Sequence, residues 1–383
     1  MRLRFPVFDL PPEAEALRGE VREFIAAELR AGLWKPGGDF ATHFDAGFSR
    51  RLGERGWLGM TWPKQYGGHA RSALERLVVT EELLAASAPV AAHWIADRQS
   101  GPLLLRFGSE AQRKRFLPGI ARGETFFSIG MSEPDAGSDL AAVRTRATKV
   151  ADGWRIDGQK VWTSFAHRNH YAIVLARSGD AGESRHAGLS QFIVDLKAAD
   201  VKVRPIVNMA GNAEFNEVLF AGTFVPDDML VGEPGNGWHQ VTSELAFERS
   251  GPERYLSSIR LAEAALRCAR AKPSARVREA LGRMTAKLIA LRSMSIAVAA
   301  LLQNGEMPNL EAALIKDLGN AFEREQIAVF RTLRAEFAEP GARALEEYHA
   351  ALAESTLYAP SWTLRGGTRE VLRGLVARGL GVR

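Results

Sequence analysis

Cysteine is almost absent: Cys268 is the only one among 383 residues. One thiol forms no internal disulfide and builds no thiolate zinc site by itself, so a disulfide scaffold is excluded and no metal site is predicted. A reducing, cytoplasmic location is therefore expected. The first residues contain no apolar stretch before Asp9 and Glu13, so no signal peptide is expected.

Long apolar runs and blocks of one charge are also missing. The longest apolar runs, such as residues 296–302, are too short to cross a bilayer, so no membrane association is expected. Fifty basic and 45 acidic residues leave a net charge of +5, but the two signs are mixed along the chain. No nucleic-acid partner is therefore indicated. Hydrophobic residues at 46% and charged residues at 25% exclude a mainly disordered chain.

The pattern of the remaining residues changes twice along the chain. Apolar residues recur at helical steps before Gly123 and again after Gly237, and turn-rich, β-branched segments lie between. The sequence predicts an α+β fold with an N-terminal helical domain over residues 1–123, a middle β-domain over 124–235, and a C-terminal helical bundle over 236–383.

Individual elements can be predicted within these blocks. Helices are expected over Ala73–Ala86 and after a Ser109 cap. Two more are expected where apolar residues recur at helical spacing near the C-terminus, in two stripes. Two Asp-Gly pairs, at 152–153 and 157–158, predict tight hairpin turns. Further strands are expected at 171–176 and 191–194. The two later stripes are Val277, Leu281, Met284, Leu288, Leu291 and Val298, and Leu310, Leu314, Leu318, Phe322, Val329 and Leu333.

Two segments of the middle block could bind a ligand. Residues 128–140 leave a strand through Pro and Gly with several hydroxyls, which suits a phosphate or a flavin ring, and a plain surface turn is the alternative. Residues 158–164 place Trp162 and two hydroxyls at a strand end. Trp162 fits either a core position or a cofactor platform.

Glu248 interrupts an apolar helical stripe that contains Trp238 and Val241 and is expected to continue through Tyr255, with a kink at Pro252. A carboxylate on such a face is costly unless it is paired, protonated or used in chemistry. It is either a catalytic base whose pKa burial raises, or one half of a structural pair with a nearby arginine.

Residues 364–371 contain two glycines followed by Thr368, a credible helix N-cap. A helix N-terminus at this place could face an anion or a polarised carbonyl. A plain helix start is the alternative.

Taken in order, these segments resemble the acyl-CoA dehydrogenase family over nearly the whole chain, because several weak motifs recur at family spacing. The matching segments are 56–68, 107–110, 117–120, 131–139, 156–162, 225–232 and 366–368. The resemblance implies an N-terminal helical domain, a middle β-barrel or sandwich domain and a C-terminal four-helix bundle, with FAD as cofactor. It also implies flavin contacts from the loop residues and a FAD-phosphate site at the last helix. Those cofactor residues would be Met131, Ser132, Gly137, Ser138, Trp162, Ser164, Thr368 and Glu370.

The reaction implied by the resemblance is α,β-dehydrogenation of an acyl-CoA thioester, with electrons passed to an electron-transfer flavoprotein. Glu248 followed by Arg249 resembles members that act on branched, long-chain or steroid thioesters and carry the base on a helix, since Gly366 occupies the other position used for the base. Substrate contacts would come from Ser138, Arg249 and Gly366, with the Gly366 N–H and a flavin hydroxyl as donors to the enolate oxygen.

The partner is implied by what the chain lacks. Homotetrameric members use an Arg-x-x-Phe-Gly motif and a Gly-Gly loop to hold FAD across subunits, whereas residues 270–274 and 337–341 match neither. This departure resembles bacterial heterotetrameric dehydrogenases. A homo- or hetero-oligomer, a dimer of dimers with a homologous chain, is expected. A non-catalytic partner subunit, a flavin oxidase or monooxygenase, and a DNA-binding relative are the alternatives.

Overall fold

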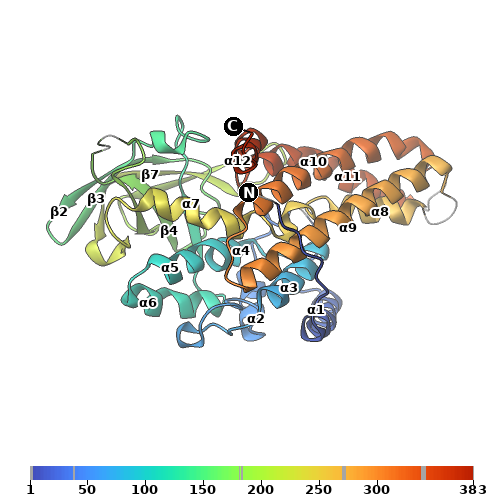
Figure 1. Cartoon of the computed structure of the whole chain (residues 1–383), viewed down its shortest axis with the longest axis horizontal. Helices are drawn as coiled ribbons and strands as arrows, with labels where there is room; N and C mark the ends of the chain where they lie inside the picture. Colours follow the sequence, from blue (N-terminus) through green and yellow to red (C-terminus); the bar gives the residue numbers. More distant parts are fainter. Residues whose placement is uncertain are drawn as a thin grey trace. The chain divides into compact units, whose positions relative to one another are not determined.

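The computed structural model describes residues 3–37, 39–180, 182, 184–269, 273–337 and 342–382, without the side chains of 244–248 and 342. The chain forms two compact units, each made of separate stretches of sequence. We call Met1–His43, Ser72–Ala88 and Ala246–Arg383 the helical unit. Phe44–Arg71 and Pro89–Leu245 form the sheet unit. Figure 1 labels their helices and strands.

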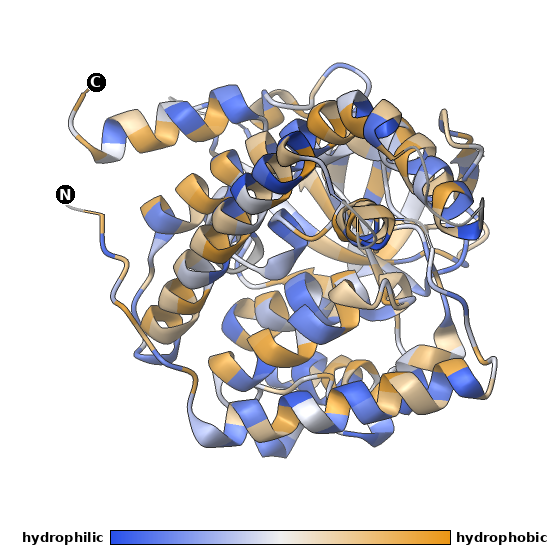
Figure 2. Ribbon diagram, turned by 90° about the vertical axis from the view of Figure 1, so that its right-hand side faces the viewer, coloured by the Kyte–Doolittle hydropathy of each residue, from blue (hydrophilic) through white to orange (hydrophobic). Residues whose placement is uncertain are grey.

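The helical unit is built mainly from long helices, each of which packs against one or more of the others. The helices are α1 (Pro12–Arg30), α3 (Ala73–Ala85), α8 (Ile259–Ala269), α9 (Ala275–Gln303), α10 (Asn309–Leu333), α11 (Ala342–Leu364) and α12 (Arg369–Gly379). Helix α3 packs against α1 and α9, and α10 packs against α8, α9, α11 and α12. The expected C-terminal helices are confirmed. Hydrophobic and hydrophilic residues alternate along the helices in Figure 2, as amphipathic packing requires.

Helix α10 buries more polar side chains than its apolar stripe predicts. Leu318, expected on the inward face, is 42% exposed. Lys316 and Glu323 are each 1% exposed instead. Lys316 Nζ donates to Asn320 Oδ1 at 2.7 Å and to the Trp362 carbonyl at 2.8 Å. The prediction for Leu318 is wrong. Helix α10 is in contact with other helices on several sides, and hydrogen-bonded polar side chains occupy part of its buried surface.

Helix α9 departs from the expectation that no apolar stretch could cross a membrane. Its length and composition meet the requirement for a membrane span, because Lys287 and Arg292 interrupt the apolar run without making the stretch polar overall. Less than half of that stretch is buried inside the structure. A core helix of a bundle meets the same requirement, and α9 packs against both α3 and α10.

In the part of the chain that the structure describes, the sheet unit contains one sheet of eight strands. The strands are β1 (Phe127–Gly130), β2 (Arg146–Val150), β3 (Gly153–Lys160), β4 (Tyr171–Arg177), β5 (Leu189–Asp195), β6 (Val201–Ile206), β7 (Phe215–Pro226) and β8 (Leu230–Val231). Their order is β6-β7-β3-β2-β4-β5-β8, and β1 pairs in parallel with β4. All the strands lie between residues 124 and 235. The expected middle β-domain is therefore confirmed as a single sheet.

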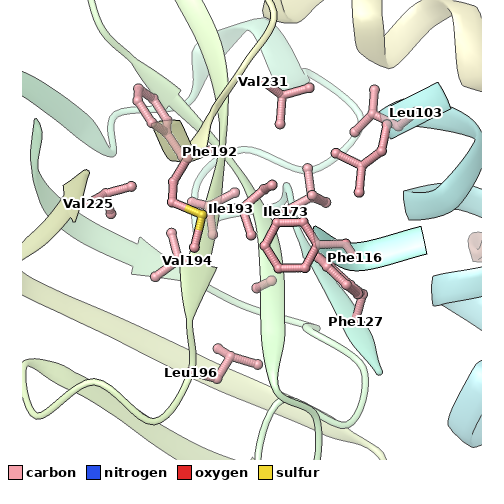
Figure 3. Close-up of a cluster of buried hydrophobic side chains, with 14 of the residues drawn as sticks. Leu103, Phe116, Phe127, Ile173, Phe192, Ile193, Val194, Leu196, Val225 and Val231 are labelled. Atoms are coloured by element: carbon pink, nitrogen blue, oxygen red, sulfur yellow. The ribbon is translucent and has the colours of Figure 1, made fainter. Parts of the chain in front are cut away.

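The sheet unit also contains helices, some of which contribute side chains to the core of the sheet. They are α2 (Ala46–Glu54), α4 (Ala91–Ile95), α5 (Gly101–Phe107), α6 (Glu110–Ala121) and most of α7 (Gly237–Glu248), with a π-helical turn, Ala96–Ser100, joining α4 to α5. Phe116 of α6 contacts Phe127 and Tyr171 edge to face, at ring-centre distances of 5.6 and 5.1 Å. Figure 3 shows Phe116 and Phe127 beside Ile173 of β4. This contact fixes Phe127 at the start of β1, and the candidate loop at residue 131 departs from the other end of this four-residue strand.

Local signals predicted several elements correctly. Ser109 caps α6 and Ser72 caps α3, each with a reciprocal capping box. A tight turn joins β2 to β3 where the first Asp-Gly pair predicted one, but its two residues are Ala151 and Asp152, and Gly153 already belongs to β3. The second pair does not form a turn, so that prediction is wrong. Asp157-Gly158 lies inside β3 at a bulge, and Gly158 is needed there because a Cβ would lie 2.5 Å from Thr145 Oγ1.

The helix with Glu248 ends earlier than its apolar stripe predicts. Trp238 and Val241 pack against the buried core as expected, but α7 ends at Glu248. Tyr255 therefore lies outside α7, after a short 3-10 turn, Pro252–Arg254. Pro252 has no N–H to bond the Glu248 carbonyl, so the helix stops at Glu248 and is not merely kinked.

Candidate active site

The loop after β1 is held by backbone contacts with the end of β3. The Met131 carbonyl accepts a hydrogen bond from Lys160 Nζ at 2.9 Å. The Ser132 carbonyl accepts one from the Val161 N–H, also at 2.9 Å. The chain then turns, with reciprocal bonds between the backbones of Glu133 and Ala136. The structure therefore brings Met131 and Ser132 next to the segment that leads to Trp162.

Gly137 and Ser138 lie further along the same loop and are exposed. A Cβ built on Gly137 meets nothing within 4 Å, so no contact in the described part of the chain requires glycine there. Their assignment to the flavin or to the substrate stays a prediction.

Trp162 is 58% exposed and has a φ of +62°, so the core interpretation of this residue is wrong. A positive φ is uncommon for a bulky residue and is kept only where the surroundings enforce it. The neighbouring Thr163 N–H donates to the Asn216 carbonyl at 3.0 Å. The indole also contacts the edge of Phe215, at a ring-centre distance of 6.0 Å. The backbone of Trp162 is strained and its large indole ring is exposed. Such a ring is suited to cover a flat ligand.

Buried amides that the sequence analysis missed hold the segment around Ser164. Asn216 is 0% exposed, and its Nδ2 donates to the Thr163 carbonyl at 2.9 Å. Ser128 Oγ donates to the Ser164 carbonyl at 2.8 Å, and Asn169 Nδ2 donates to Ser128 Oγ at 3.0 Å. Asn216 interrupts the apolar alternation of β7, which is the one sequence signal that could have indicated its role.

In the helical unit, Glu248 is the last residue of α7, and its side chain lies outside the described residues. Arg249, the next residue, is 6% exposed, and its Nε donates to the Gly366 carbonyl at 3.1 Å. The structure therefore joins the helix end that carries Glu248 to the two-glycine loop. Catalysis by Glu248 stays a prediction.

Gly366 and Gly367 have φ values of +70° and +99°. A Cβ on Gly366 would lie 3.0 Å from Arg254 Nη2, and a Cβ on Gly367 would lie 3.3 Å from Arg249 Nη2. Glycine is required here both by the backbone conformation and by the neighbouring guanidinium groups.

Asp39 fixes the residue before these glycines. This aspartate is 3% exposed, and Arg365 Nη1 lies 2.9 Å from each of its oxygens. Trp362 Nε1 also donates to Asp39. The sequence analysis missed Asp39, which precedes Arg365 by more than 300 residues and belongs to no motif.

Thr368 is the N-cap of α12, as predicted, with its hydroxyl accepting from the Val371 N–H at 3.5 Å. Glu370 is exposed in the first turn. Its own backbone N–H and the Thr368 hydroxyl hold the pKa of its carboxyl below the usual value. Arg369 and Arg373 both bond Asp317 of α10, at 2.7 and 3.3 Å, which docks α12 in the helical unit.

The candidate residues thus form two groups, one in each unit. The sheet unit holds the loop and indole residues, and the helical unit holds the base, glycine and capping residues. The motif segments 270–272 and 338–341 lie outside the described residues. Along the chain, the described elements follow a helical–β–helical order.

Comparisons with known proteins define the family. Residues 11–124 match the acyl-CoA dehydrogenase N-terminal domain, and residues 128–222 match the acyl-CoA dehydrogenase middle domain. Acyl-CoA dehydrogenase IpdE1 of Mycolicibacterium smegmatis is 33% identical, over 95% of this chain and 96% of its own. IpdE1 of Mycobacterium tuberculosis is 39% identical, over 74% and 77%. The chain belongs to the acyl-CoA dehydrogenase family of flavoprotein oxidoreductases, which act on CH–CH groups.

Solved structures agree over almost the whole length. A chain of the Tcur3481-Tcur3483 steroid ACAD superimposes with a TM-score of 0.84 and 31% identity, covering 98% of this chain and 99% of that one. A chain of the ChsE4-ChsE5 complex from Mycobacterium tuberculosis gives a TM-score of 0.82 and 29% identity, with both chains fully covered.

Proposed function

We propose that the chain catalyses FAD-dependent α,β-dehydrogenation of an acyl-CoA thioester with a bulky, branched or steroid-type acyl group, and that the electrons pass to an electron-transfer flavoprotein. The observation that carries the proposal is the bond from Arg249 Nε to the Gly366 carbonyl. Family members place the catalytic base either on this helix or in this loop, and the bond brings both positions together.

The residues of the sheet unit fit FAD. Trp162 offers an exposed aromatic face, and the Met131–Ser132 backbone is held rigidly beside it. In the helical unit, Thr368 begins a helix whose N-terminal amides and dipole suit a phosphate. When bound, FAD would supply the acceptor for the hydride that leaves the β-carbon.

Glu248 is proposed to take the proton from the α-carbon as this hydride leaves, so that the substrate loses one proton and one hydride and gains a C=C bond. The thioester oxygen gathers negative charge during this step and needs a donor. The Gly366 N–H is proposed as that donor. Two contacts hold this backbone in place. Arg249 donates a hydrogen bond to the Gly366 carbonyl, and the side chain of the preceding residue, Arg365, is paired with Asp39.

The relatives support the substrate class. One solved relative is described as a steroid ACAD, and the Glu-Arg pair at the end of α7 is the arrangement expected of members with bulky thioesters. We propose a ring-bearing or branched acyl group on this basis.

Anaerobic mixing of the purified protein with a panel of acyl-CoAs tests the proposal through bleaching of the flavin absorbance. Steroid-type and branched thioesters are expected to bleach it, and Glu248→Gln is expected to keep FAD and lose bleaching by at least a thousandfold. Glu233→Gln, an exposed loop position, is the matched control. Near-normal bleaching by Glu248→Gln would remove Glu248 as the base. A protein that stays free of flavin even when it is co-expressed with a homologous chain would remove the proposed activity.

A non-catalytic partner subunit is the second candidate, since two of the similar structures contain two different chains. The same experiment separates the two functions. A non-catalytic subunit predicts that Glu248→Gln in this chain leaves the bleaching by the complex with its homologous partner unchanged.

A further inference from the structure

Lys160, the last residue of β3, is 0% exposed. Lysine is almost never fully buried unless it is paired. Its Nζ lies 2.8 Å from Glu133 Oε1 and 2.9 Å from the Met131 carbonyl oxygen. Burial lowers the pKa of Lys160 to about 8, and the Glu133 carboxylate opposes that shift. The ammonium therefore has two defined acceptors, both in the loop that follows β1.

Glu133 is also fully engaged. Its carboxylate accepts the backbone N–H groups of Arg144, at 2.7 Å, and Thr145, at 2.9 Å. Burial by itself would raise the pKa of Glu133, but Lys160 and these N–H groups bring it below its ordinary value. The pair thus ties the β1 loop, the segment 144–145 and the end of β3 into one rigid junction.

Stability is a poor explanation for such a pair. Removing two charges from water costs several kcal/mol per ion, and well-packed apolar residues often stabilise a protein as well or better. What an apolar pair cannot do is donate a hydrogen bond to the Met131 carbonyl. The carbonyl of Met131 and the N–H of Ser132 belong to one planar trans peptide group and point in opposite directions. Fixing the carbonyl toward Lys160 therefore fixes the Ser132 N–H on the far side.

The same junction reaches Trp162. Val161, between Lys160 and Trp162, donates its N–H to the Ser132 carbonyl. Gly130 leaves room for the lysine stem, since a Cβ there would lie 3.3 Å from Lys160 Cγ. One buried side chain therefore sets both the Met131–Ser132 loop and the start of the Trp162 segment.

We propose that Lys160 is a positioning residue for the flavin: by holding the Met131 carbonyl it presents the Ser132 N–H, and through Val161 the Trp162 indole, to the isoalloxazine, while Glu133 neutralises its charge. This inference rests on the FAD dependence proposed above. It assigns to Lys160 a geometric role that acts through neighbouring backbone groups.

The test compares two variants of the full-length chain with the wild type, all prepared in the same assembly and titrated with FAD. Lys160→Met removes the donor to Met131, whereas Glu133→Gln breaks the ion pair but leaves Lys160 able to reach the Met131 carbonyl. FAD affinity, the visible spectrum of bound flavin and the melting temperature are measured for each. The control is Lys149→Met, which breaks the exposed Lys149–Asp227 pair of the same unit.

Lys160→Met is expected to bind FAD at least tenfold more weakly, about 1.4 kcal/mol at 25 °C, with a shifted flavin spectrum. Glu133→Gln is expected to melt at a lower temperature but to bind FAD within threefold of the wild type. Equal FAD loss in both variants would reduce Lys160 to a stability role and overturn the inference. Wild-type affinity and spectrum in Lys160→Met would overturn it while leaving the proposed function intact, and a wild type that binds no FAD would overturn both.

Gly130→Ala keeps the inference testable if Lys160→Met does not fold. The added methyl group displaces the lysine stem by a few tenths of an ångström without removing its charge. We expect a several-fold loss of FAD affinity and a changed flavin spectrum in a folded protein. An unchanged spectrum and affinity in this variant would overturn the inference.

Discussion

Gly366 is a residue whose role depends on having no side chain. Its φ of +70° costs an L-residue about 1–2 kcal/mol, and a Cβ would press on Arg254 Nη2 at 3.0 Å. We expect Gly366→Ala to lower the free energy of unfolding by at least about 1 kcal/mol and to reduce turnover. Urea unfolding and steady-state assays measure both effects.

Gly374→Ala is the matched control for this substitution. Gly374 lies inside α12, and a Cβ added there would meet nothing within 4 Å, so alanine is expected to stabilise the helix by up to about 1 kcal/mol. If Gly366→Ala were equally harmless, the two-glycine loop would not need its observed conformation.

His93 is a buried imidazole that should make stability depend on pH. Its Nδ1 lies 2.8 Å from Ser49 Oγ, and burial, with a smaller contribution from Arg98, lowers its pKa from 6.5 to about 3. Between these two values the unfolded chain binds the proton and the folded chain does not, so stability falls as the pH falls. Acidification from pH 7 to pH 5 should cost about 2 kcal/mol from this residue. Urea unfolding at both pH values measures the loss, and His93→Gln should remove that part of it.

At the scale of the residue, the sequence singles out candidates for chemistry but not the residues that hold those candidates in place. Glu248, Trp162 and Gly366 could be singled out because each breaks a local pattern. Lys160 and Asp39 could not, because a single Lys or Asp is usually a surface residue. Their burial depends on partners 27 and 326 positions away, Glu133 and Arg365, and local patterns do not report such distant contacts.

Among the elements, predictions from local signals were reliable and predictions from extended periodicity were less so. The Ser109 cap predicted the start of α6 correctly, because a cap is a contact within four residues. The apolar stripe predicted a helix that continues past Glu248, where α7 ends. Residue spacing does not show that Pro252 leaves the Glu248 carbonyl without a hydrogen-bond donor. The Leu318 error has a similar origin, since the stripe does not reveal how many neighbours α10 has.

Helix α12 depends on one carboxylate for its attachment to α10. Asp317 accepts hydrogen bonds from Arg369 and Arg373 of α12, and Leu372 of the same helix is fully buried. We expect Asp317→Asn to weaken this attachment by about 1.4 kcal/mol, which corresponds to about tenfold faster amide hydrogen exchange in α12. Mass-spectrometric exchange of peptides over 369–379 measures it.

Glu306→Gln serves as the control for this exchange measurement. It breaks the exposed ion pair with Arg4 and should leave α12 exchange unchanged. Unchanged exchange in Asp317→Asn as well would mean that apolar contacts, such as those of Leu372 and of Gly379 with Leu310, anchor the helix without the ion pairs.

At the scale of the molecule, the order helical–β–helical could be predicted from the sequence, but the composition of the two units could not. The helical unit combines the N-terminal stretch and α3 with the C-terminal helices, joined by contacts such as Asp39 with Arg365 and Arg18 with Glu81. Amphipathic periodicity shows that a helix has a buried face and does not name the element that covers it. The boundaries at 123 and 235 therefore remain predictions about sequence segments.

The assembly leads to the last prediction. Residues 270–274 and 337–341 lack the motif and the Gly-Gly loop with which homotetrameric members are expected to hold FAD across subunits, and two similar structures are complexes of two different chains. A chain without these residues has fewer contacts for the adenine half of FAD, and a homologous partner would supply them. We expect the protein expressed alone to carry well below one FAD per chain, and co-expression with a homologous chain to restore occupancy in a heteromer. The ratio of flavin to protein absorbance, together with native mass spectrometry, measures both, and one FAD per chain in a homo-oligomer would contradict the prediction.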